Sequence, residues 1–210
     1  MPKKIPSASG RRSRDPWGTD RINARRTFLI VCEGTKTEPL YFEGFRGPRV
    51  VISVEGTGKN TLTLVDEAVQ IRQRLMKAQT VEECWCVFDR DSFPVDHFNN
   101  AVYKAEANGF NVAFSNQAFE FWYLLHFDYC DSALYRSSYW ERLSAKLGRK
   151  YEKSDQTSRS MYDRLHSLIP VAIANAKRLH ANYAHETPEQ RDPCTTVHLL
   201  VERLLENTAR

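Results

Sequence analysis

The stretch CWCVFDRDSF, residues 84–93, contains an apolar run followed by two carboxylates, and it indicates both the fold class and the chemistry of this chain. Cys84–Phe88 is a short apolar run with aromatic and β-branched residues, which predicts a buried strand. Asp89 and Asp91 follow it, one residue apart. In an extended segment residues i and i+2 point the same way, so both carboxylates can reach one divalent cation. The alternative is a plain surface turn, where Asp is common.

A second carboxylate, Glu33, follows a second apolar run, Thr27–Cys32. Two further strands are predicted, at Val50–Val54 and Phe110–Phe114. Between the strands lie predicted helices: Thr37–Phe45 with Thr37 as its N-cap, Thr61–Ala78, and a helix that opens at Pro94 and stops at Gly109. This alternation is typical of a parallel sheet with crossover helices. Because parallel strands end at one rim of a sheet, Glu33 and Asp89 are expected to lie close together.

The pattern becomes helical from Gln117 onward. The run AFEFWYLLHF, residues 118–127, is apolar nearly all round and predicts a buried helix. Further helices are predicted at Tyr139–Leu147, Ser160–Ile169, Val171–Tyr183 and Thr195–Glu206, with polar loops at Lys150–Ser158 and His185–Pro193. The fold class is therefore α/β, a parallel sheet of about four strands followed by a helical region. We expect a basic, disordered arm at 1–26, a core at 27–128 and a helical extension at 129–210.

Charge is distributed unevenly along the chain. The formal net charge is +4, but residues 1–26 carry a net charge of +6 and the remainder a net charge of −2. A basic arm suits contact with a nucleic-acid backbone, although such a run is also often a solvated tail, and both interpretations stay open. The candidate nucleic-acid-binding residues are Arg25, Arg26, Lys36, Lys59 and Arg90.

Several classes of protein are disfavoured. No apolar run is long enough to span a membrane, and the N-terminus lacks the apolar segment of a secretory signal. The five cysteines lie mostly in apolar runs and lack the paired spacing of a zinc site, so we expect reduced thiols and a cytoplasmic location. Gly56–Thr61, GTGKNT, fails as a Walker A loop, because Ser53 stands where the first Gly belongs and Asn60 follows Lys59.

Other acidic and histidine residues have two interpretations each. Glu38 could join the acidic site or simply favour the first turn of its helix. Glu120, among aromatic residues, needs a partner if it is buried, and could extend the acidic site or pair with an Arg. A structural role is the default for His126 and His198.

Four motifs in sequence order resemble those of the RloB-like proteins. They are CEGTKTEPLYF, VFDRDSF, SNQAFEFWYLLHF and DPCTTVHLLVERL, and the resemblance covers about residues 20–207. One departure is Gln117, where the family pattern has Pro; it affects the turn.

The resemblance implies a Toprim-like core, similar to that of OLD-type nucleases, topoisomerases and DnaG primases. In such cores an acid after the first strand and an Asp-x-Asp after a later strand bind Mg²⁺, here Glu33, Asp89 and Asp91. Mn²⁺ would serve as well. Glu38 and Glu120 match further recurring positions and are candidate catalytic residues with these three. The resemblance also implies an AAA-type ATPase partner and a role in anti-phage defence.

Two functional hypotheses follow. The first is a metal-dependent nuclease acting on DNA or RNA. The second is a non-catalytic module that binds nucleic acid or regulates an ATPase, with the apolar stretch Phe119–Phe127 as a docking face. A homo-oligomer is compatible with either.

Overall fold

A computed structural model describes residues 26–48, 50–58, 61–90 and 95–208. Five residues named above, Arg25, Lys59, Asn60, Asp91 and Pro94, lie outside the described residues, as does the basic arm before Arg26. The prediction of a disordered arm therefore stays a prediction.

The centre of the fold is a five-stranded sheet in the order β2-β1-β3-β4-β5. Its strands are β1 (Arg26–Cys32), β2 (Val50–Gly56), β3 (Glu83–Asp89), β4 (Asn111–Asn116) and β5 (Cys194–Thr195). The first four are parallel to their neighbours, and β5 is antiparallel to β4. The predicted α/β class with a parallel sheet is confirmed, and the four predicted strands are present with boundaries shifted by one or two residues.

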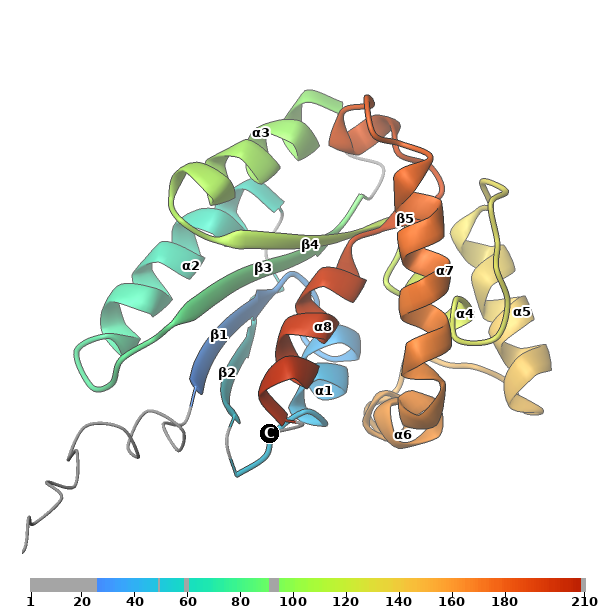
Figure 1. Ribbon diagram of the computed structural model, residues 1–210, viewed down its shortest axis with the longest axis horizontal. Coiled ribbons are helices and arrows are strands. Elements are labelled where there is room, and N and C mark those ends of the chain that lie inside the picture. Colours follow the sequence, from blue (N-terminus) through green and yellow to red (C-terminus); the bar gives the residue numbers. More distant parts are fainter. Residues whose placement is uncertain (1–25, 49, 59–60, 91–94, 209–210) are drawn as a thin grey trace, which may run out of the picture.

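Helices cover both faces of the sheet (Figure 1), which explains why its central strands are apolar on both sides. Alternate residues of β1 belong to different cores: Phe28 and Ile30 to one, Leu29 and Val31 to the other. The second core is formed with α2 (Thr61–Leu75) and α3 (Val95–Ala107). The first includes residues of α1 (Thr37–Glu43), α4 (Glu120–Leu124) and α8 (Val197–Thr208). Gly109 ends the α3 segment with φ +75°, as predicted.

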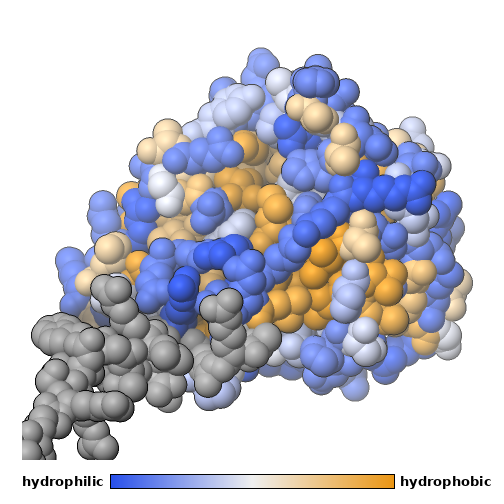
Figure 2. All heavy atoms as spheres, in the orientation of Figure 1, coloured by the Kyte–Doolittle hydropathy of each residue, from blue (hydrophilic) through white to orange (hydrophobic). Residues whose placement is uncertain are grey.

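The helical region contains α5 (Arg136–Leu147), α6 (Asp155–Leu165) and α7 (Ile169–Ala181), with 3₁₀ turns at His166–Leu168 and Pro188–Gln190. Helix α6 begins five residues earlier than predicted, inside the expected loop. Ser154 is its N-cap, and the side chain accepts a hydrogen bond from the Thr157 N–H. Figure 2 shows apolar atoms gathered around α8 and α7 on the face in view, inside a rim of hydrophilic atoms.

The short strand β5 was not predicted. The sequence pattern placed a helix start at Thr195, but Thr195 pairs with Ser115 of β4 and the helix begins at Val197. The Phe114 N–H donates to Thr196 Oγ1 at 2.9 Å, and the Ser115 and Thr195 hydroxyls lie 2.9 Å apart. These side-chain contacts draw the chain onto the sheet edge. The N-cap of α1 is also different: it is Lys36, one residue before the predicted Thr37.

All five cysteines are buried and free of disulfide bonds, as expected. In the part of the chain that the structure describes, no helix has the length and apolar character needed to cross a membrane.

Candidate active site

Glu33 and Asp89 meet where β1 and β3 end. The Glu33 N–H donates to Val87 O at 2.9 Å, which fixes the residue after β1 against β3. The Glu33 side chain then accepts the Asp89 N–H at Oε2, 3.2 Å away, and the Thr61 hydroxyl at Oε1, 3.4 Å away. One carboxylate thus joins the ends of two strands to the start of α2, as the sequence predicts for acids at a common rim.

The loop before α2 packs against the same turn. The Gly58 N–H donates to Glu33 O at 2.9 Å, and Gly58 has φ +63°. Gly56 lies so close to Gly34 O and Thr35 that a Cβ would come within 2.6 and 2.7 Å of them. The GTG segment is therefore a turn that depends on its glycines, and it supports Glu33 from one side.

Glu38, in the first turn of α1, is a third carboxylate of this rim. It is buried, and its Oε2 atom has no hydrogen-bond partner within the described residues. A Cβ on Gly34 would overlap Glu38 Oε2. Gly34 therefore leaves the space into which the Glu38 carboxylate extends, next to Glu33.

Glu120, at the start of α4, is fully buried and completes what we call the acidic cluster: Glu33, Glu38, Asp89 and Glu120. Its Oε1 accepts the Tyr151 hydroxyl at 3.1 Å and lies 2.9 Å from Lys153 Nζ, while Oε2 has no partner among the described residues. The expected need for a partner is thus met, but by a lysine and a tyrosine rather than an arginine.

The four side chains influence one another electrostatically. Loss of hydration raises the pKa of Glu33 to about 7, with Glu38 adding to the effect and the Asp89 N–H and Thr61 opposing it. Loss of hydration also raises the pKa of Asp89 well above its usual range, helped by Glu38 and Glu120 and opposed by Lys153. The pKa of Glu38 rises mainly through burial. Ionising all the carboxylates of the cluster therefore costs free energy, and a bound cation would lower that cost.

The donors fit a hard divalent cation by their chemistry. Carboxylate oxygens are the ligands that Mg²⁺ and Mn²⁺ prefer, and Glu38 and Glu120 each have a buried oxygen without a partner among the described residues. As these side chains stand, no group of three Asp, Glu, His or Cys residues in the described ranges is arranged to hold a metal ion. Asp91, the third predicted ligand, lies outside those ranges.

Two cations near the acidic cluster were not predicted. Lys153 pairs with Glu120 as described, and its ammonium lowers the pKa of Asp89 and Glu38. Arg136, at the start of α5, donates from Nη2 to Gln117 O at 3.3 Å, and its charge lowers the pKa of Glu33. No periodic pattern in the sequence indicates that Lys153 or Arg136 lies near the acidic cluster. The one available signal was Glu120, a buried acid that needed a partner.

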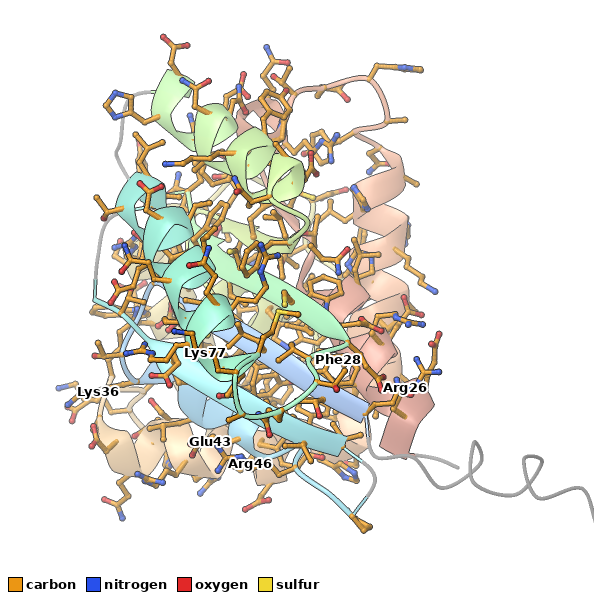
Figure 3. The ribbon with its side chains drawn as sticks, turned by 90° about the vertical axis from the view of Figure 1, so that its left-hand side faces the viewer. Arg26, Phe28, Lys36, Glu43, Arg46 and Lys77 are labelled. Atoms are coloured by element: carbon orange, nitrogen blue, oxygen red, sulfur yellow. The ribbon has the colours of Figure 1, made fainter. Side chains whose placement is uncertain are left out.

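The predicted nucleic-acid contacts are spread over the molecule. Lys36 lies just beyond β1, beside the rim, and pairs with Asp155 at 2.8 Å. Arg90 follows Asp89, is partly buried and donates its N–H to Ser115 O at 2.9 Å. Arg26 starts β1 and pairs with Glu82 at 3.7 Å, and Figure 3 shows it toward the opposite end of the sheet from Lys36. The structure therefore brings Lys36 and Arg90 to the rim, but not Arg26.

The two histidines have structural surroundings. His126 Nδ1 lies 2.9 Å from Trp122 O, and burial lowers the pKa of this residue to about 4. His198 Nδ1 lies 3.2 Å from Thr195 O, and its ring packs against His180 at 5.6 Å between centroids. Burial lowers the pKa of His198 to about 4 as well. Both rings are therefore neutral at pH 7.

Comparison with known proteins identifies one family. Residues 28–204 match the family model described as RloB-like protein. A search of the curated proteins finds no match to the chain. The matched range includes all four residues of the acidic cluster together with Arg136 and Lys153.

Proposed function

Because the chain belongs to the RloB-like family, we propose that its acidic cluster is the centre of a Mg²⁺-dependent nuclease with a Toprim-like core. The observation that carries the proposal is the convergence of four carboxylates, from the ends of β1 and β3 and the first turns of α1 and α4. Burial raises the pKa of three of them, which is the setting in which acids bind cations or exchange protons.

Glu33 and Asp89 would hold the metal, with Asp91 added by the family resemblance. Mg²⁺ or Mn²⁺, when bound there, supplies a Lewis acid that polarises the phosphodiester and lowers the pKa of water. The hydrogen bonds from the Asp89 N–H and Thr61 fix the orientation of Glu33. Glu38 and Glu120 are candidates for proton transfer to or from the reacting oxygens.

Lys153 and Arg136 offset the negative charge of the acidic cluster. A phosphodiester approaching four carboxylates is repelled, and two cations at the edge of the cluster reduce that repulsion. Lys36 and Arg90 would contact phosphates farther along the strand, with Arg25, Arg26 and Lys59 as further candidates from sequence.

The alternative is a non-catalytic module that binds nucleic acid or regulates an AAA-type ATPase. One observation favours it: Lys153 already places an ammonium on Glu120, so one cation within the acidic cluster is supplied by the chain itself. Both functions are compatible with a role in anti-phage defence, which the family resemblance suggests.

A nuclease assay separates the two functions. Purified protein is incubated with Mg²⁺ or Mn²⁺ and single- and double-stranded DNA and RNA, including tRNA. Cleavage by the wild type and its loss in both Asp89→Ala and Asp91→Ala support the nuclease. Full cleavage by both variants would refute it. If the wild type cuts nothing, the assay is repeated with an AAA-type ATPase of the kind that the family resemblance implies as partner, and a continued lack of cleavage supports the non-catalytic module.

A further inference from the structure

One face of α5 carries an aromatic ring and a cation beside the acidic cluster. Arg136 and Trp140 are four residues apart in this helix, so their side chains lie on the same face. Arg136 reaches Gln117 O, just before α4. Lys153 Nζ lies 6.0 Å from the centroid of the Trp140 ring and 2.9 Å from Glu120 Oε1. A single ammonium group therefore separates the Trp140 ring from the acidic cluster.

The Trp140 ring is also open to solvent. Its relative exposure is 39%, and that of Tyr135, the residue before α5, is 80%. By contrast, Trp85 and Trp122 are buried in the first core. The exposed part of the Trp140 ring is a flat apolar surface beside charged groups, and a ligand with an aromatic ring of its own can cover it.

We propose that Trp140 stacks an unpaired base of the substrate while Arg136 and Lys153 contact the adjacent phosphates. The substrate class is then single-stranded or looped nucleic acid. Aromatic rings stack on any base because every base has a π face, but a base inside a duplex already stacks on its neighbours. The charges agree with this occupant, because phosphates are anionic and the ring is flanked by two cations.

We call Trp140 with Arg136 and Lys153 the stacking platform. The inference rests on the proposed function, since the platform affects the reaction only if the acidic cluster acts on nucleic acid. It adds a property that a site of carboxylates alone does not have. Metal-bound carboxylates contact phosphate oxygens, which single and double strands share, whereas a stacking ring distinguishes the two.

Binding measurements without a divalent cation test the platform separately from cleavage. Fluorescence anisotropy of a labelled oligonucleotide compares a single strand with a duplex of the same sequence, as DNA and as RNA, in EDTA. We expect Trp140→Ala to weaken single-strand binding about tenfold and leave duplex binding unchanged. Trp140→Phe should keep most of the affinity. Tyr103→Ala is the matched control, because Tyr103 is an aromatic residue of α3 with 49% exposure.

Intrinsic fluorescence provides a second measurement on the wild type. A base stacked on Trp140 quenches its emission, so a single strand should quench the wild type more than Trp140→Phe. Single-strand affinity in Trp140→Ala equal to wild type, or an equal loss for single strand and duplex, would overturn the proposal. If the platform behaves as expected but no metal supports cleavage, the nuclease proposal fails alone. If cleavage occurs without strand preference, the platform fails alone.

Discussion

The acidic cluster and its cations come from two different regions of the chain. The carboxylates lie at the ends of β1 and β3 and in the helices that follow β1 and β4, all before residue 121. Lys153 and Tyr151, which contact Glu120, come from the segment between α5 and α6. Arg136 comes from α5 itself. The helical region is therefore part of the site, because it supplies the ammonium that pairs with Glu120 and the cations that lower the pKa of Asp89 and Glu33.

The largest expected effect comes from the strand-end half of the site. Asp89→Asn keeps the size of the side chain but removes its charge, so the proposed metal loses one of its carboxylate ligands. We expect cleavage to fall at least about 100-fold, with little change in the melting temperature. The measurement is initial cleavage rate with a labelled substrate. Asp163→Asn, on α6, serves as a control and should cleave like the wild type.

The second prediction concerns the helical half. Lys153→Met removes the charged partner of a fully buried carboxylate, while about a third of the Lys153 side chain is exposed. We expect a loss of about 2 kcal/mol in the free energy of unfolding, measured with urea. Adding Glu120→Gln should restore part of it, since the unpaired charge is then gone. If the double variant is less stable than either single variant, the pair is not coupled as described.

The third prediction concerns how pH changes the charge of Glu33 and, through it, the stability of the fold. The pKa of Glu33 is about 7 in the fold, above its ordinary value of 4.5, so the folded protein holds an extra proton between these values. The contribution of Glu33 to stability therefore falls as pH rises through this window and is lowest above pH 7. Without metal, the wild type should lose about 3 °C more than Glu33→Gln between pH 5 and pH 8, roughly 1 kcal/mol after allowing for solvent screening.

Thermal melts in EDTA measure this difference, with Glu55→Gln, an exposed glutamate, behaving like the wild type. Added Mg²⁺ or Mn²⁺ should raise the melting temperature of the wild type more at pH 8 than at pH 5, because protons compete with the cation. An equal rise at both pH values would contradict a carboxylate-bound metal.

The smallest expected effect is at Gly34. An added methyl group overlaps Glu38 Oε2, and the flexible carboxylate moves aside. Gly34→Ala should reduce cleavage about threefold and cost less than about 1 kcal/mol in stability. Gly47→Ala is its control, because nothing lies within 4 Å of a Cβ there. Equal rates in both variants would mean that the position of Glu38 is unimportant for the reaction.

The difference between the halves also explains what the sequence could predict. Glu33 and Asp89 follow apolar runs, and the alternation of strands and helices places both at one rim, so their meeting was predictable. Lys153 lies 33 residues after Glu120 in a polar segment, and nothing in its local pattern marks it. Strand β5 is two residues long, too short for a periodic signal. The N-cap at Ser154 could have been predicted from the sequence, because Ser is a preferred N-cap residue and Asp155 is an acid that favours the first turn of a helix.

The pairing of β5 with β4 has a consequence for folding during translation. The contacts of Phe114 and Ser115 with Thr196 and Thr195 span 80 to 82 residues of sequence, and α8 adds its apolar side chains to the first core only afterwards. On a ribosome that adds about 5–20 residues per second, β4 waits several seconds with its outer edge uncovered. During that interval the nascent chain has the features that recruit chaperones, an open strand edge and an incomplete core.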